Sequence, residues 1–251
     1  MHIHLIKSLY LHIVSKKITE RSDNLKVSLN QVSYFYKKNV SVLTDITTSF
    51  EFGKTYLLFG RNGAGKSTLA SILAGEKKPT KGIIEFPKNI NTSNVGYQIQ
   101  EFNSFPNLKV KEVILFWKSI NDISTVDENV LIYALEIESI LNKKVKLLSG
   151  GEARALSLYL TCLVEKEIII LDEPFAGLDT KKKEIFSEEI KKMAFKNKLV
   201  ILISHEIKGY EDLFDYITVL REGSIKSVLD TQKLDKNDLF SILKMEVWGN
   251  E

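Results

Sequence analysis

Runs of consecutive apolar residues mark the predicted core of the chain. The clearest are residues 56–59, 168–171 and 199–203, and each ends abruptly at a glycine or a polar residue. Strands of a parallel sheet are covered on both faces and therefore read as continuous apolar runs. Residues 27–34 and 46–50 instead alternate apolar with polar side chains and are rich in β-branched residues, which is typical of antiparallel strands. The pattern predicts an α/β fold with a mixed sheet and an antiparallel β subdomain.

A helical period replaces the strand pattern in the middle of the chain. Two sets of apolar residues each share one face of a predicted helix: Val110, Val113, Ile114 and Trp117 in the first, and Val130, Leu131, Ala134 and Leu135 in the second. The spacing Thr125-x-x-Glu128 is that of a capping box, which would open the second helix. We therefore expect an α-helical subdomain, over about 102–165, inserted between strands of the core.

The two ends of the chain carry weaker patterns. Residues 216–251 predict two short strands joined at Glu222-Gly223, followed by a helix over about 236–244. Residues 1–24 are expected to form an N-terminal extension to a domain that spans residues 25–251. Their apolar positions fall near helical spacing, and His2-x-His4 could hold a metal ion, but further ligands are lacking nearby. A peripheral extension is the favoured interpretation.

Composition narrows the possible classes of protein. Hydrophobic residues make up 44% of the 251 residues and charged residues 27%, as in ordinary globular proteins. No apolar run approaches the roughly 18 residues of a membrane-spanning helix, so any membrane role would depend on another subunit. The net charge of +3 is small and its lysines are dispersed, so we expect no nucleic-acid partner. The single cysteine, Cys162, lies in an apolar run and suits a reducing compartment.

One glycine-rich segment fits the pattern G-x-x-x-x-G-K-[ST] between a predicted strand and a predicted helix. This phosphate loop comprises Gly60, Arg61, Asn62, Gly63, Ala64, Gly65, Lys66, Ser67 and Thr68. Its glycines permit a sharp turn that points main-chain N–H groups at a phosphate, at the positive end of the following helix. Lys66 would reach the β- and γ-phosphates, and the Ser67 hydroxyl would ligate Mg²⁺. The segment predicts binding of a nucleoside triphosphate.

Polar residues follow two of the other apolar runs. Asp172 and Glu173 come directly after residues 168–171, and His205 follows the run that ends at Ser204. Because parallel strands present their carboxyl ends at one edge of a sheet, we expect these side chains to lie beside the phosphate loop.

The order of motifs along the chain is distinctive: the phosphate loop, the helical insert, Leu-Ser-Gly-Gly-Glu at 148–152, Ile-Leu-Asp-Glu-Pro at 170–174, Gly-Leu-Asp at 177–179, and a strand that ends in histidine. Over residues 25 to about 230 this order resembles the nucleotide-binding subunit of ATP-binding-cassette (ABC) transporters. The signature segment, residues 148–152, separates this family from kinases, small GTPases and other phosphate-loop ATPases. The resemblance implies a phosphate-loop ATPase core, with ATP and Mg²⁺ as cofactors.

The resemblance also implies a role for individual residues. The phosphate loop would hold the triphosphate, Ser67 and Asp172 the metal, and Glu173 would act as the general base on the attacking water. His205 would contact the γ-phosphate and orient Glu173 or that water. Gln100 matches the glutamine that senses Mg²⁺, with Gln98 as a less favoured competitor. Tyr36 matches the aromatic residue that stacks on adenine, with Tyr34 left open.

In the family, the signature segment closes over ATP held by a second subunit. Ser149, Gly150, Gly151 and Asp179 are therefore expected to contact the nucleotide of a homodimer or heterodimer partner. Ser149-x-x-Glu152 also has the spacing of a capping box, which suggests that Ser149 caps its own helix until the dimer closes. The chain departs from the family at Glu152, where glutamine is common, and at Gly177, where alanine often stands.

The function implied is that of an ATP-hydrolysing subunit, peripheral to the cytoplasmic face of the cell membrane, which energises transport through membrane subunits. The short helical insert and the sequences around the phosphate loop and residues 173–179 look similar to energy-coupling-factor importers, and a small export ATPase is nearly as compatible. The alternative is a soluble ABC ATPase in assembly or repair, for example in iron–sulfur cluster biogenesis.

Overall fold

The structure is a computed structural model that describes residues 25–37, 40–98, 102–123, 129–164 and 166–248. Three of the sequence predictions lie outside these ranges: the N-terminal extension, the position of Gln100, and the capping box at Thr125 and Glu128. The predicted mixed α/β architecture is confirmed, with one six-stranded and one three-stranded sheet.

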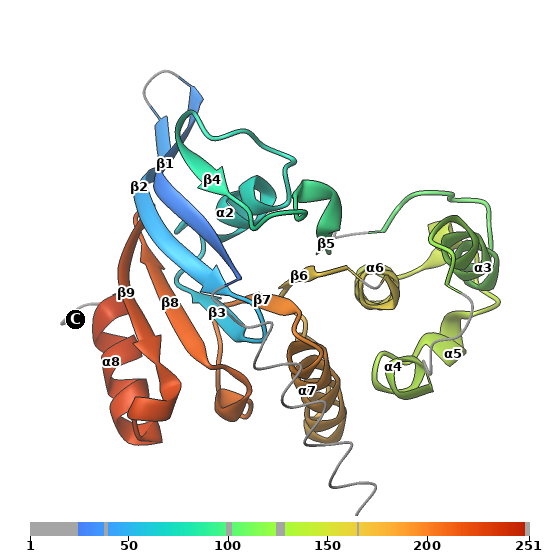
Figure 1. Cartoon of the computed structure of the whole chain (residues 1–251). Helices are drawn as coiled ribbons and strands as arrows, with labels where there is room; N and C mark the ends of the chain where they lie inside the picture. Colours follow the sequence, from blue (N-terminus) through green and yellow to red (C-terminus); the bar gives the residue numbers. More distant parts are fainter. Residues whose placement is uncertain (1–24, 38–39, 99–101, 124–128, 165, 249–251) are drawn as a thin grey trace, which may run out of the picture.

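The six-stranded sheet forms the centre of the molecule, with the order β5-β6-β7-β3-β8-β9 (Figure 1). Its strands are β3 (Thr55–Phe59), β5 (Val95–Tyr97), β6 (Ile168–Asp172), β7 (Leu199–Ser204), β8 (Tyr216–Arg221) and β9 (Ser224–Asp230). Neighbouring strands are parallel from β5 to β8, and only β9 pairs antiparallel. The three apolar runs are β3, β6 and β7, adjacent and parallel as predicted.

The second sheet has three antiparallel strands in the order β2-β1-β4 (Figure 1). It consists of β1 (Lys26–Lys37), β2 (Val40–Glu51) and β4 (Lys81–Glu85). Helix α2 (Lys66–Leu73) lies between this sheet and the central one (Figure 1). The phosphate loop therefore begins at the junction of the two sheets.

Apart from α2, the helices divide into two groups. Four lie between β5 and β6 in the chain and gather beyond the β5–β6 edge of the central sheet (Figure 1); we call them the helical region: α3 (Val110–Ile120), α4 (Asn129–Ala134), α5 (Ile137–Ile140) and α6 (Gly150–Leu163). The others lie under the central sheet: α7 (Thr180–Phe195) and α8 (Lys236–Trp248). Single 3₁₀ turns complete the fold: η1 (Thr92–Asn94), η2 (Val145–Leu147), η3 (Glu211–Leu213) and η4 (Thr231–Lys233).

Each face of the central sheet has its own apolar core. On β6, Ile170 packs with the core shared by β1, β2 and α2, whereas Ile169 and Leu171 pack with the core shared by the helices below. Strands β3 and β7 alternate in the same way. Burying a side chain of this size contributes about 1.5–3 kcal/mol. The three central strands therefore form a rigid platform, and their carboxyl ends are fixed relative to one another.

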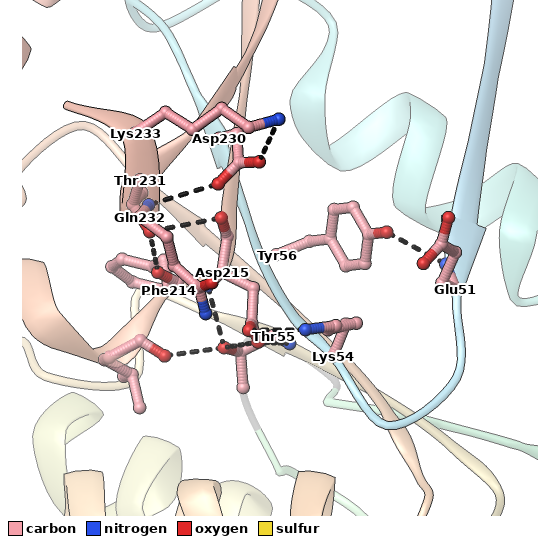
Figure 2. A network of polar contacts seen from close by, with 11 residues as sticks. Glu51, Lys54, Thr55, Tyr56, Phe214, Asp215, Asp230, Thr231, Gln232 and Lys233 are labelled. Atoms are coloured by element: carbon pink, nitrogen blue, oxygen red, sulfur yellow. Dashed lines mark hydrogen bonds and ion pairs between the residues drawn. The ribbon is translucent and has the colours of Figure 1, made fainter. Parts of the chain in front are cut away.

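A polar network fixes the other end of the platform, where β3 begins (Figure 2). The Asp215 carboxylate, just before β8, accepts hydrogen bonds from the Thr55 main-chain N–H at 2.9 Å and from Lys54 Nζ at 3.1 Å. Thr231 donates its hydroxyl hydrogen to the main chain at Phe214. The Asp215 contacts tie the start of β3 to the start of β8, and the Thr231 contact ties the end of β9 to the same place.

Candidate active site

The phosphate loop connects β3 to α2 through glycines that other residues could not replace. A Cβ atom on Gly60 would lie 2.2 Å from the Leu220 carbonyl oxygen. Gly65 has a φ of 102°, and a Cβ atom there would lie 2.7 Å from Leu43 Cδ2. Gly65 is also the N-cap of α2 and offers no side-chain cap. The first N–H groups of the helix are thus left to an anion, as the sequence pattern predicts.

Lys66 lies at the start of α2 with its side chain folded over the loop. Its Nζ atom donates hydrogen bonds to the carbonyl oxygens of Gly60 at 2.6 Å and Arg61 at 3.1 Å. Burial lowers the pKa of Lys66, although the nearby Glu173 and Asp172 carboxylates oppose that shift. The lysine is therefore a desolvated cation, close to where phosphate oxygens would lie.

Ser67 and Asp172 supply an oxygen pair suited to a magnesium ion. Ser67 Oγ donates a hydrogen bond to Asp172 Oδ2 at 3.2 Å, and Asp172 is 4% exposed. Mg²⁺ prefers hard oxygen ligands and completes its shell with water and substrate phosphates. A hydroxyl and a carboxylate beside a phosphate loop therefore fit this ion.

Gln98 contributes a contact that sequence reasoning had not assigned. The side chain is fully buried just after β5, and its Oε1 atom accepts a hydrogen bond from the Asp172 main-chain N–H at 3.0 Å. Its Nε2 atom has no hydrogen-bond partner among the described residues. An unsatisfied buried donor costs about 1–3 kcal/mol, so burial of this amide is unfavourable at Nε2 and compensated in part by the bond at Oε1. The sequence indicated Gln98 only as the less favoured competitor of Gln100 and did not show its contact with Asp172.

The Glu173 carboxylate is hydrogen-bonded to residues at the carboxyl end of β7. Its Oε2 atom accepts a hydrogen bond from Ser204 Oγ at 2.7 Å, while Oε1 accepts from the His205 main-chain N–H at 3.1 Å and lies 2.5 Å from His205 Nδ1. Glu173 has a φ of 49°, in the left-handed region that non-glycine residues rarely adopt. The predicted convergence of the β6 and β7 tips is thus confirmed by direct contacts.

These elements enclose a cavity of about 380 Å³. Its lining residues come from both sheets, the phosphate loop and the helical region: Tyr36, Val42, Asn62, Gly63, Gly65, Lys66, Ser67, Thr68, Arg154, Asp172, Glu173 and Ile203. Tyr36 lines it while Tyr34 does not, although the two rings pack edge to face at 5.4 Å between centroids. Arg154 was not predicted, because nothing in the sequence shows that the third residue from Gly151 faces the phosphate loop. His205, Gly60, Arg61 and Ala64 border the site without lining the cavity.

The signature segment opens α6 with the predicted capping box. Ser149 Oγ accepts a hydrogen bond from Glu152 N at 3.3 Å, and Glu152 Oε2 accepts from Ser149 N at 3.0 Å. Ser149 and Gly151 line a different cavity of about 270 Å³, next to Gly177. Asp179 caps α7 by accepting a hydrogen bond from Lys182 N at 2.9 Å. These residues are not brought to the phosphate cavity of their own chain.

Comparison with known proteins identifies the arrangement. The sequence pattern of the family described as "ABC transporter" matches residues 43–176, from β2 to just beyond Glu173. The chain belongs to the ABC transporter family. It is an ABC-type ATPase, and the nucleotide is ATP.

Relatives and solved structures agree with this assignment. The energy-coupling factor transporter ATP-binding protein EcfA2 of Staphylococcus saprophyticus subsp. saprophyticus is 30% identical over 235 residues, which is 84% of this chain and 81% of that protein. A solved ATP binding subunit of an ABC transporter matches the fold with a TM-score of 0.72, at 20% identity over 87% of this chain and 99% of that one. The cbiO1 protein of Clostridium perfringens, part of the transporter complex cbiONQ, gives a TM-score of 0.65 at 21% identity, covering 89% of this chain and 95% of that one.

Within the described ranges, no helix of this ABC ATPase has both the length and the apolar character needed to cross a membrane.

Proposed function

We propose that this ABC ATPase drives an importer of the energy-coupling-factor type through membrane subunits at the cytoplasmic face of the cell membrane. The observation that carries the proposal is the similarity to an EcfA2 protein, which extends over 84% of this chain and 81% of that protein. Other features of the structure support individual parts of this function.

The contacts around Glu173 support hydrolysis with this residue as the general base. A carboxylate oriented by Ser204 and His205 can accept a proton from a water while Lys66 and Mg²⁺ stabilise the charge on the phosphates. Ser67 and Asp172 would hold the metal. Gln100, which lies outside the described residues, would be a third ligand. Tyr36, 60% exposed at the mouth of the cavity, is free to stack on the adenine ring.

The positions of the signature residues support a dimeric site. Ser149, Gly150, Gly151 and Asp179 do not line the phosphate cavity of their own chain, although α6 begins with N–H groups that suit a phosphate. In a head-to-tail dimer they would cover ATP held by the partner, so each site would be completed by a second subunit. Closure with ATP and reopening after hydrolysis would then be the power stroke.

An apolar surface on the helical region supports docking to a membrane subunit. Phe105 and Phe116 pack edge to face at 5.3 Å between centroids, yet both remain more than 40% exposed. Leu108, Leu115 and Ile120, in the same stretch of the chain, are exposed as well, and Leu115 is 67% exposed. Exposed apolar side chains gathered on a helix and the turn that precedes it are typical of an interaction site.

The test uses a tagged Glu173→Gln chain, purified from its native cell after trapping with ATP. The substitution keeps the shape of the side chain and removes its basicity, so we expect ATP binding without turnover. Detergent-solubilised membranes and cytosol are analysed separately, and copurifying proteins are identified by mass spectrometry. A polytopic membrane partner is expected, and Leu115→Asp should reduce its recovery. Recovery with cytosolic proteins alone would contradict transport, and turnover above about a tenth of wild type would contradict the assignment of the base.

A further inference from the structure

Arg154 links the two cavities of the ATPase site. It lines the phosphate cavity together with Lys66 and Glu173, and it lines the neighbouring cavity together with Ser149 and Gly151. Among the described residues it is the only one shared by the two linings. Arg154 belongs to α6, the helix that the signature segment opens, so one side chain connects that helix to the chain's own phosphate loop.

The local structure leaves the guanidinium of Arg154 without a carboxylate partner. The nearest acid in sequence, Glu152, already accepts hydrogen bonds from Ser149 N at 3.0 Å and from Lys143 Nζ at 2.7 Å. Within the described ranges no ion pair involves Arg154. The side chain is only partly exposed, so it holds a cation beside the cavity rather than in bulk water.

The charge of the cavity lining shows which ligand this cation suits. Without Arg154, the lining holds one cation, Lys66, against the two carboxylates of Asp172 and Glu173. The side chains of such a lining would leave the main-chain N–H groups of the phosphate loop, Lys66 and a single Mg²⁺ to neutralise a triphosphate in the presence of two carboxylates. Arg154 adds a second positive charge, so the cations and carboxylates of the lining are equal in number. Its planar guanidinium can donate hydrogen bonds to two phosphate oxygens at once.

We propose that Arg154 binds the terminal phosphate of the ATP held by its own chain and thereby orients the signature segment for the ATP of the partner chain. With Glu173 as the proposed base, the terminal phosphate would be the group that faces it, and Arg154 lines the same cavity as Glu173. Since α6 is one continuous helix from Gly150 to Leu163, a contact at Arg154 moves Ser149 and Gly151 with it. The proposal rests on the proposed ATPase site and adds a link between its two halves.

Nucleotide binding tests the contact. Full-length chains that carry Glu173→Gln are titrated with a fluorescent ATP analogue and with its ADP counterpart. Arg154→Met should weaken ATP binding by about 10- to 100-fold, the range for a lost charge-assisted hydrogen bond, and ADP binding by less than about 3-fold. The ATP affinity of Arg154→Lys should lie between those of the parent and Arg154→Met, because lysine keeps the charge but cannot donate the paired hydrogen bonds of a guanidinium. Lys146→Met removes an exposed cation from the same region and should change neither affinity.

Dimer formation tests the link. At ATP concentrations that saturate each variant, light scattering should show dimers for the Lys146→Met control and monomers for Arg154→Met. Equal losses of ATP and ADP affinity, or unchanged affinities, would overturn the phosphate contact. Normal dimers at saturating ATP would overturn the link. Thermal unfolding without nucleotide should give the same midpoint for all variants, and a lower midpoint for Arg154→Met would assign it a structural role instead. If the parent chain bound neither nucleotide, the ATPase site itself would be contradicted.

Discussion

The capping box at the start of α6 allows the folding role of Ser149 to be separated from its proposed role in nucleotide binding. In the single chain, Ser149 Oγ accepts from Glu152 N at 3.3 Å, and the reciprocal bond from Ser149 N to Glu152 Oε2 measures 3.0 Å. Glu152 is held in addition by Lys143, at 2.7 Å. Because the hydroxyl's bond is the longer one and the residue is exposed, the box depends more on Glu152 than on the hydroxyl.

The two roles predict effects of different size for Ser149→Ala. Loss of the cap should cost about 0.5–1 kcal/mol, the lower part of the usual range, which lowers the Tm of a chain of this length by about 1–4 °C. Loss of a charge-assisted bond to phosphate should cost about 1.5–3 kcal/mol at each site. A homodimer contains two such sites, so its dissociation constant should rise by a factor of about 10² to 10⁴.

A second substitution makes the distinction sharp. Aspartate is as good an N-cap as serine, so Ser149→Asp should keep the Tm, while its carboxylate repels the partner's γ-phosphate and abolishes dimers. Both variants are made with Glu173→Gln, and dimers are measured by light scattering with and without ATP, beside thermal unfolding. Dimers of Ser149→Asp as stable as those of the parent would refute the reasoning.

Other parts of the structure give predictions of their own. Gln98→Met should raise the Mg²⁺ concentration for half-maximal ATPase activity by about 10-fold or more, because the Asp172 main-chain N–H loses its acceptor; Thr218→Val removes another buried, unpartnered polar atom away from the site and should leave this concentration unchanged. Asp215→Ala should lower the free energy of unfolding in urea by about 1–3 kcal/mol, since a buried N–H at the start of β3 loses its partner, and an unchanged value would contradict the role of the network. Burial raises the pKa of Cys162 to about 12, so the thiol should resist maleimide at pH ~8.5 in the native chain and react only in denaturant.

Features set by local sequence were predictable. The strands β3, β6 and β7 are buried on both faces and therefore lack alternation, which identified them and their shared edge. The phosphate loop and the capping box at Ser149 depend on spacings of a few residues, so they could also be predicted.

Features that depend on distant segments were not predictable. Gln98 contacts the main chain of Asp172, 74 positions away, and Arg154 reaches a cavity whose other walls are built by the phosphate loop and the two sheets. Neither residue stands in a motif that states its partner. The folded chain brings the partners together, and only then does the chemistry of an amide or a guanidinium indicate a role.

The hydrogen bonds that Ser204 and His205 make to Glu173 limit how this residue can act as the proposed base. An ionised carboxylate can accept about four hydrogen bonds. Oε1 already takes the His205 N–H at 3.1 Å and, when Nδ1 carries the proton, the imidazole at 2.5 Å, while Oε2 takes one bond from Ser204 at 2.7 Å. One acceptor position remains, on Oε2, for an attacking water. If His205 turned toward a γ-phosphate, it would release a second position on Oε1, so the arrival of ATP and the readiness of the base would be coupled through a single side chain.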